Sequence, residues 1–181
     1  ISCMLEHAGG FPLEGTALSF PGGEHLVLGL NVQSTGQGHA TVFNPMLAER
    51  LGIKPEHIEH RHGDSAMEIA GYASVGSRSA MTVSHALIKT VEALLNKGKV
   101  IAATVLETAE TDIEYRDGRF GVVGTDRSVT LFDLAARAKE MKKRGEIPED
   151  LDTKTNAETP QTFPNGCHIA EVEIDPKTGE M

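Results

Sequence analysis

The feature that most constrains the fold is an apolar run at residues 24–32. This run places leucine at alternate positions, Leu26, Leu28 and Leu30. Alternation with a period of two is the pattern of a β-strand, so the three side chains should share one face. Val27 on the opposite face is also apolar, and we therefore expect a strand that is covered on both sides.

Helical periodicity elsewhere can supply the covering layers. Apolar residues recur every three or four positions over residues 79–97, where Gly98 is expected to end the helix. Thr130 with Asp133 resembles a capping box that opens another helix. Further elements are expected as strands at 1–7, 15–20, 58–62 and 169–174, a hairpin at 113–123, and a helical piece at 100–107. The sequence therefore predicts an α/β (α+β) fold, a mixed sheet with helices packed on it.

Two segments are harder to assign from their composition. A helix that follows His39 should end at Gly52, but Pro45 leaves two alternatives open. Either a short helix starts at Asn44 with Pro45 in its first turn, or a longer helix is kinked. Residues 145–161 are polar and rich in Thr, Pro and acid, so we expect a mobile connection there.

The composition restricts the classes of partner. The chain is 39% hydrophobic and 24% charged and has a formal net charge of −9, which disfavours nucleic acid as a partner. No apolar run approaches the roughly 20 residues of a membrane span. Cys3 and Cys167 form no disulfide framework and are interpreted as reduced thiols, which indicates a cytoplasmic protein. The start at Ile1 suggests that the sequence begins inside a longer chain.

Two glycine-rich loops precede helices and share one design. These are Gly36-Gln37-Gly38 and Gly76-Ser77-Arg78-Ser79. Glycines let backbone amides approach a ligand, and a helix start adds free N–H groups and a positive dipole end. Serine hydroxyls and the Arg78 guanidinium suit a phosphate, whereas the Gln37 amide suits a heterocycle edge or an oxo group. The alternative is an ordinary turn with Ser79 as an N-cap.

A cluster of histidines offers a different kind of site. His57, His60 and His62 lie close together in the chain, and on a strand the last two would share a face that could hold a metal. No cysteine is nearby and the His-Glu-x-x-His motif is absent. We therefore expect no metal among them, and a polar strand face is the simpler interpretation.

The order of motifs resembles a known family. The chain carries, in sequence, GQGHATVFNPMLAERLGI, HGD, GSRSAM, DIEYRDGRF and FPNGCHIAEVEIDPKTGE. This order resembles the large subunit of the molybdenum hydroxylases, the family of xanthine dehydrogenase and aldehyde oxidase. It is most similar to the branch of aerobic carbon monoxide dehydrogenase. The resemblance covers nearly the whole chain.

The resemblance implies a molybdenum–molybdopterin cofactor, often in the cytosine dinucleotide form. It also implies oxidation of carbon monoxide, an aldehyde or an N-heterocycle with water as the oxygen source. Electrons would leave through iron–sulfur and FAD subunits or domains, in an oligomer of heteromers. The family's loops map onto Gly36, Gln37 and Gly38 for the molybdenum–pterin part and onto Gly76, Ser77, Arg78 and Ser79 for phosphate or pterin groups. Gln37 is thus expected to point at the cofactor.

The resemblance also marks what this sequence lacks. The family's catalytic glutamate lies in a Val-Gly-Glu-like motif that does not occur here, so no catalytic residue is assigned. Residues 1–145 would be the first part of the cofactor-binding domain, 146–162 a polar connection, and 163–181 the truncated start of the next subdomain. Such a fragment should lack cofactor and be inactive alone. A non-enzymatic assembly or interaction module with the same fold is the alternative.

Overall fold

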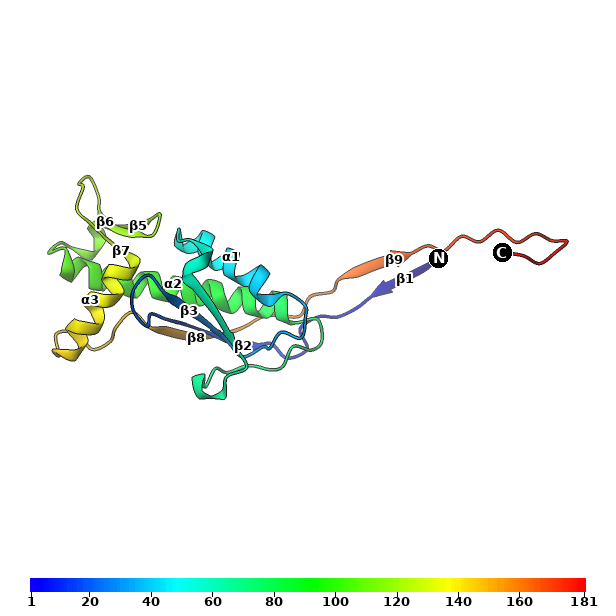
Figure 1. Cartoon of the computed structure of the whole chain (residues 1–181), viewed down its shortest axis with the longest axis horizontal. Coiled ribbons are helices and arrows are strands. Elements are labelled where there is room, and N and C mark those ends of the chain that lie inside the picture. Colours follow the sequence, from blue (N-terminus) through cyan, green and yellow to red (C-terminus); the bar gives the residue numbers. More distant parts are fainter.

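The computed structural model describes all residues, 1–181, as a body with a long arm (Figure 1). The body holds three α-helices and most of the strands, and both termini lie on the arm. In chain order the elements are β1 (Ser2–Leu5), β2 (Leu13–Ser19), β3 (Leu26–Leu30), α1 (His39–Leu51), η1 (Pro55–His57), β4 (Ile58–His62), η2 (Ser65–Met67), α2 (Ser79–Val105), η3 (Glu110–Asp112), β5 (Ile113–Arg116), β6 (Arg119–Val122), β7 (Ser128–Thr130), α3 (Leu131–Lys143), β8 (Thr153–Glu158) and β9 (Asn165–His168).

The main sheet has four strands in the order β4-β3-β2-β8. β3 and β4 run parallel, whereas β2 is antiparallel to both β3 and β8. A second sheet, β5-β6-β7, is antiparallel. The expected mixed α/β fold is therefore confirmed.

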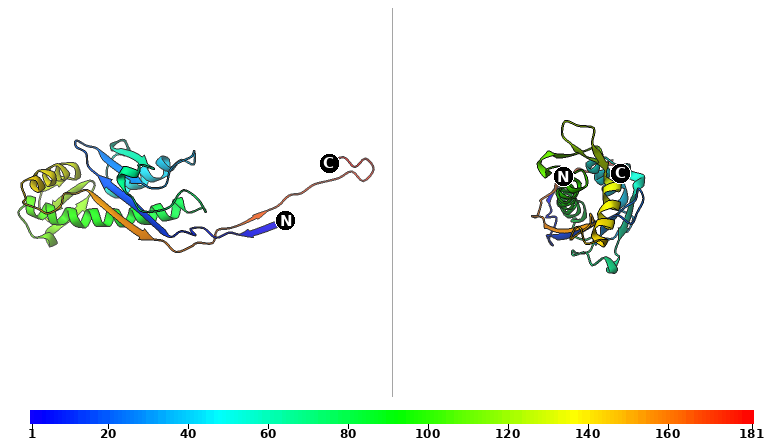
Figure 2. Two further views of the ribbon diagram at one scale, coloured as in Figure 1. Left: turned by 90° about the horizontal axis from the view of Figure 1, so that it is seen from below. Right: turned by 90° about the vertical axis from the view of Figure 1, so that its left-hand side faces the viewer.

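The core lies on one face of the main sheet. The three alternating leucines of β3 belong to one buried cluster with Phe43 of α1 and Leu87 of α2. Both helices therefore cover the same face, and α2 runs along the length of the body beside the strands (Figure 2). Hydroxyl contacts add to this packing, because Thr90 of α2 lies 2.5 Å from the Thr16 hydroxyl of β2 and 2.6 Å from the Thr155 hydroxyl of β8.

The opposite face of β3 is covered by the segment around η2. A Cβ on Gly29 would overlap the Met67 side chain, and Gly15 of β2 donates its amide to the Ala70 carbonyl at 2.8 Å. All five residues of β3 are buried. This confirms the expectation of a strand covered on both sides, and it explains why glycine stands at a central strand position.

The helices differ from the sequence interpretation at one point. α1 is the longer of the two alternatives, with Pro45 inside it and Gly52 at its end with a φ of 58°. α2, however, does not end at Gly98 but continues as one helix to Val105. Gly98 is buried against the Phe120 ring and leaves no room for a Cβ. Close packing, and not a helix stop, accounts for this glycine.

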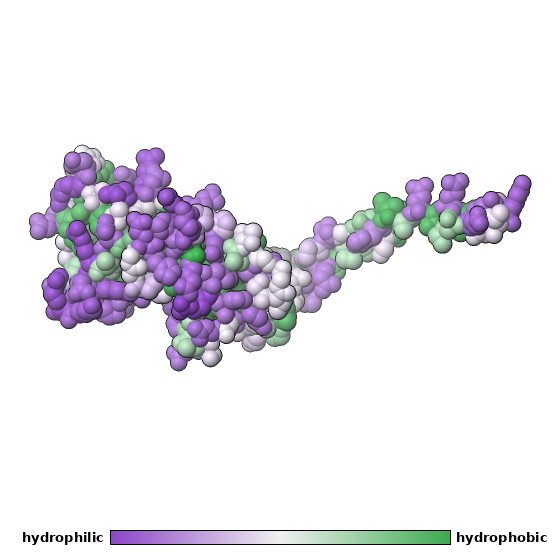
Figure 3. All heavy atoms as spheres, viewed as in Figure 1, coloured by the Kyte–Doolittle hydropathy of each residue, from purple (hydrophilic) through white to green (hydrophobic).

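Two expectations about the C-terminal region are wrong. The segment expected to be a mobile connection contains β8, whose backbone pairs with β2 along the edge of the sheet. Its outward residues are polar, so its composition is that of a loop. The strand expected at 169–174 is absent, and β9 lies just before it. β9 pairs with β1 in a two-stranded ribbon that forms part of the arm, where apolar and polar residues both lie at the surface (Figure 3).

Among the helices, none combines the length and the apolar character that crossing a membrane requires.

The packing at Gly98 predicts the effect of a small substitution. Gly98→Ala should reduce the free energy of unfolding by about 1–3 kcal/mol, because overpacking outweighs the higher helix propensity of alanine. Urea unfolding measures this change. Asn96→Ala, on the exposed side of the same helix, is the control and should not destabilise. Equal stability of the Gly98 variant and the wild type would show that Phe120 moves aside freely.

Candidate functional site

The two glycine-rich loops lie on opposite sides of one cavity of about 450 Å³. One wall comes from the loop between β3 and α1, and the other from the loop between β4 and α2. The lining residues are Gln37, His39, Val42, Phe43 and all of 74–80. The structure therefore brings together two segments that the sequence analysis could only treat separately.

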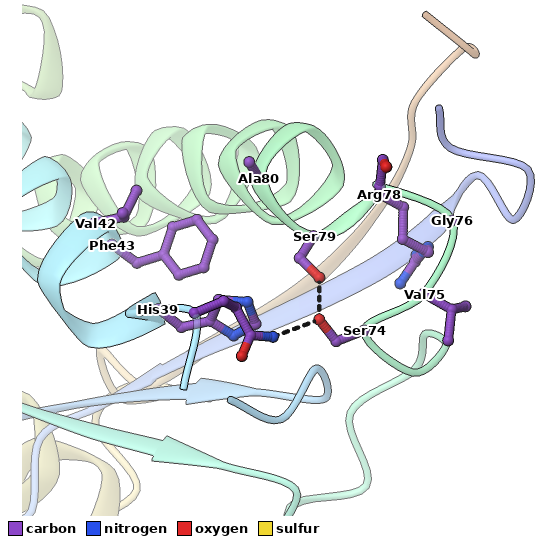
Figure 4. A pocket seen from close by; sticks show the side chains of 11 residues that line it. His39, Val42, Phe43, Ser74, Val75, Gly76, Arg78, Ser79 and Ala80 are labelled. Atoms are coloured by element: carbon purple, nitrogen blue, oxygen red, sulfur yellow. Dashed lines mark hydrogen bonds between the residues drawn. The ribbon is translucent and has the colours of Figure 1, made fainter. Parts of the chain in front are cut away.

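A chain of hydrogen bonds joins the two loops. Gln37 Nε2 donates to the Ser74 hydroxyl at 2.9 Å, and the Ser74 and Ser79 hydroxyls lie 2.6 Å apart. Ser74 and Ser79 point toward each other at the pocket (Figure 4). The side-chain oxygen of Gln37, Oε1, accepts a hydrogen bond from the Thr35 backbone amide at 2.5 Å. The glutamine side chain thus sets the spacing of the loops.

Two helices begin at the cavity without side-chain caps. α1 follows Gly38, which has a φ of 77°, and α2 follows Arg78. Neither helix has a capping side-chain hydrogen bond or an acidic residue in its first turn. The first-turn N–H groups of each helix have no intrahelical partner, and each helix start carries positive partial charge. The cavity is therefore suited to an anionic group.

His39 is a site residue that the sequence analysis missed. Its side chain lines the cavity but is only 5% exposed, and neither ring nitrogen has a hydrogen-bond partner. Burial lowers the pKa of His39, and the nearby His62 lowers it further, so the ring is held neutral. A neutral imidazole has one donor and one acceptor, and both are unused here. The only sequence signal was its position directly after the Gly-Gln-Gly loop.

The neighbouring histidines do not form the metal site considered from the sequence. His60 and His62 lie side by side with ring centroids 5.5 Å apart, but His57 faces elsewhere and contacts the Glu24 carbonyl at 2.6 Å. His62 Nδ1 accepts from the Ser34 amide at 2.7 Å and so supports the first loop. Nowhere in residues 1–181 do three metal-binding side chains lie in an arrangement that could hold an ion.

The Arg78 guanidinium does not make the paired phosphate contact expected from the sequence. It is fully buried and lies 2.7 Å from a carboxylate oxygen of Glu14 on β2. It also donates to four carbonyl oxygens, those of Phe11 (3.0 Å), Leu13 (2.8 Å), Tyr72 (3.0 Å) and Ala73 (3.4 Å). Arg78 thus fixes the second loop from behind, and only its backbone remains on the cavity side. Periodicity and spacing could not show which way this side chain points.

Of the other expected residues, Gly76, Ser77 and Ser79 line the cavity, whereas Gly36 and Gly38 flank Gln37 and do not line it. Gly36, Gly38 and Gly76 all have positive φ values, which glycine adopts without strain. Ser77 is exposed and has a φ of 52°. Ser74, which joins the loops, is a second site residue that the sequence analysis missed.

The buried pair predicts a stability defect that depends on pH. The Glu14 carboxylate is fully buried, and the Arg78 guanidinium is the only charged group paired with it. Burial raises the pKa of Glu14 despite the opposing effect of Arg78. Arg78→Met leaves this carboxylate unpaired and should cost about 3–5 kcal/mol of unfolding free energy at neutral pH.

The defect should shrink as pH falls, because protonation removes the unpaired charge. Chemical unfolding at several pH values measures this, and Glu14→Gln in the Arg78→Met background should restore part of the loss. Arg144→Met, which breaks an exposed ion pair with Glu146, is the control and should change little. A defect of the same size at every pH would show that lost hydrogen bonds, and not the charge, dominate.

The burial of His39 predicts a second pH dependence, in which the free energy of unfolding falls as the pH falls. Its folded pKa lies below its ordinary value of 6.5, so the folded state binds fewer protons than the unfolded state. The contribution of His39 to the free energy of unfolding should therefore be fully present above about pH 6.5. It should decrease on acidification, by at most about 1.4 kcal/mol per pH unit. His39→Phe should flatten the curve of unfolding free energy between pH 7 and 5. The exposed His7→Gln is the control, and an unchanged slope in the Phe variant would contradict this assignment.

The sequence of this chain is similar to that of several known proteins. A family model described as the molybdopterin cofactor-binding domain matches residues 8–181. Subunit gamma of the 6-hydroxypseudooxynicotine dehydrogenase complex of Paenarthrobacter nicotinovorans is 33% identical over 151 residues, 81% of this chain and 19% of that protein. The carbon monoxide dehydrogenase large chain of Hydrogenophaga pseudoflava is 33% identical over 147 residues, 80% of this chain and 18% of that protein.

A solved structure agrees with these relatives. The crystal structure of Cu,Mo-CO dehydrogenase in the carbon monoxide reduced state superimposes with a TM-score of 0.75 and 26% identity, over 91% of this chain and 22% of that one. This chain thus spans about a fifth of the length of the curated relatives it matches. Together with the two loops at one cavity, the matches show that this chain belongs to the molybdopterin cofactor-binding domain family, found in the large subunits of molybdenum hydroxylases.

Proposed function

We propose that the cavity between the two loops holds the pterin and phosphate groups of the molybdenum cofactor. The observation that carries this proposal is the convergence of two uncapped helix starts on one cavity beside an imidazole without a partner. An anionic, hydrogen-bonding group suits these donors, whereas an apolar ligand would leave His39 unsatisfied. When bound, the molybdenum centre would supply the redox chemistry of the reaction.

Each loop has a defined task in this proposal. Ser77, Ser79 and the amides at the start of α2 hold the phosphate side, because hydroxyl and backbone donors converge there. Gln37 faces the pterin or an oxo group. Its second Nε2–H meets the Gln33 carbonyl only at 3.4 Å, a weak contact that a bound group can replace. Gly36, Gly38 and Gly76 keep the backbone close to the group, and Arg78 positions the second loop without touching it.

The reaction class comes from the family resemblance and from the names of the relatives. We assign to the complete protein the oxidation of carbon monoxide, an aldehyde or an N-heterocycle, with water as the oxygen source. The cytosine dinucleotide form of the cofactor, iron–sulfur and FAD partners, and a cytoplasmic location belong to the same proposal. The base that removes the proton lies outside this sequence. The residues of this chain bind and orient the cofactor, but residues 1–181 alone should retain little of it.

The test is the molybdenum-to-protein ratio of the complex that contains this chain. The wild type should hold about one molybdenum per large subunit. Ser79→Ala removes a donor worth about 1.5–3 kcal/mol to the charged phosphate, so cofactor retention should weaken roughly ten- to a hundredfold. Gln37→Ala removes a donor to the pterin or oxo group worth about 0.5–1.5 kcal/mol, which corresponds to a loss of roughly two- to tenfold. Metal analysis and chromatography of the nucleotide released by acid measure this, and release of CMP would identify the dinucleotide form.

Ser65→Ala is the matched control, because this exposed serine also opens a helical turn but lies outside the cavity. Arg78→Ala is a poor test, since loss of cofactor there would also follow from disruption of the loop. Full cofactor in the Ser79 and Gln37 variants would refute the assignment of these loops. No molybdenum in the wild type, from cells that load other molybdoenzymes, would favour the non-enzymatic module.

A further inference from the structure

The two cysteines lie opposite each other on the arm. The β1–β9 ribbon is antiparallel, and its register pairs Cys3 with Cys167. Cys3 Sγ donates a hydrogen bond to Cys167 Sγ across 3.5 Å, and both residues are exposed. The sequence analysis interpreted them as reduced thiols that form no disulfide framework, and 163 residues separate them in the chain. Nothing in the proposed cofactor site makes use of them.

Hydrogen bonds along the ribbon show which kind of cross-strand pair this is. Ala8 and Thr162 exchange both N–H···O bonds, and Glu6 donates to the Pro164 carbonyl. Hydrogen-bonded pairs alternate along an antiparallel ladder, so Cys3 and Cys167 form a non-hydrogen-bonded pair. In such pairs the Cα atoms are about 4.5 Å apart and the side chains are close. This separation falls within the range of about 4.4–6.8 Å that a disulfide spans, at its short end.

We propose that Cys3 and Cys167 are a redox-modified pair that closes to a cross-strand disulfide by exchange with a low-molecular-weight disulfide such as oxidised glutathione. The Cys3 thiolate attacks one sulfur of that disulfide, forms a mixed disulfide and releases one thiolate. The Cys167 thiolate then attacks the Cys3 sulfur and releases the second. Two protein thiols are oxidised, one small disulfide is reduced to two thiols, and no other oxidant is needed.

The same geometry serves either order of attack, because both thiols are exposed and lie opposite each other on the ribbon. The disulfide would be exposed on the ribbon, and exposed disulfides are more readily reduced than buried ones. The modification is therefore reversible.

The ribbon ends at the second glycine-rich loop. The Ala8–Thr162 bridge continues the ribbon toward the body, and the next residue, Gly9, donates its amide to the Gly76 carbonyl at 3.1 Å. A disulfide would restrain the two strands of the ribbon, and Gly9, which contacts the loop, directly follows the ribbon. We therefore expect the Gly9 amide, whose acceptor is the loop carbonyl, to exchange with solvent more slowly in the oxidised form.

The experiment uses the intact complex that contains this chain. It is equilibrated with oxidised glutathione, alkylated and digested without reductant, and its peptides are mapped by mass spectrometry. The wild type should yield a peptide pair joined through Cys3 and Cys167 that is two hydrogen atoms lighter than the sum of its parts, and dithiothreitol should separate the pair. Cys3→Ser and Cys167→Ser should each leave the remaining cysteine as a glutathione adduct.

The variant with both Ser2→Cys and Cys3→Ser is the matched control. It keeps two exposed thiols but moves one of them to the opposite face of β1, so it should form adducts and no internal disulfide. Adducts at both cysteines of the wild type would overturn the proposal, as would two thiols that stay unmodified. Molybdenum content is measured in parallel, so that failure here is distinguished from failure of the cofactor assignment.

Discussion

The site depends on one buried ion pair. The guanidinium of Arg78 connects the loop that precedes α2 to Glu14 and to the carbonyl groups at the start of β2. A charge in this position is costly to bury, and it is retained only because the carboxylate and four carbonyl oxygens replace its hydration. The loop is therefore held from the side of the sheet, and its opposite side lines the cavity.

The sheet topology explains why the two loops meet. β3 and β4 are parallel neighbours, and α1 crosses between them. The loops that follow these two strands must then emerge at the same edge of the sheet, which is where ligands bind in many α/β proteins. The Gln37–Ser74–Ser79 hydrogen bonds set the final spacing. Strand direction thus brings two segments that are distant in the chain to one site.

The sequence predicted the fold class and the loop positions because those features have local signals. Alternating leucines identified β3, and the glycine turns marked the starts of α1 and α2. The misses have a common cause, which is contact between distant residues. β8 is polar and becomes a strand only because it pairs with the edge of β2. Glycine is required at position 98 because the Phe120 ring packs there, and the Arg78 side chain turns inward because Glu14 is its partner. None of these partners is near in the chain.

The position of β2 has a consequence for how the protein is made. β2 lies between β3 and β8, and Thr16 pairs with Thr155. During synthesis the N-terminal strands emerge long before their C-terminal partner, and β2 keeps one unpaired edge until β8 has left the ribosome. An unpaired edge can recruit other chains. We expect the nascent polypeptide to need protection by chaperones during this interval, and assembly to begin only after the sheet is complete.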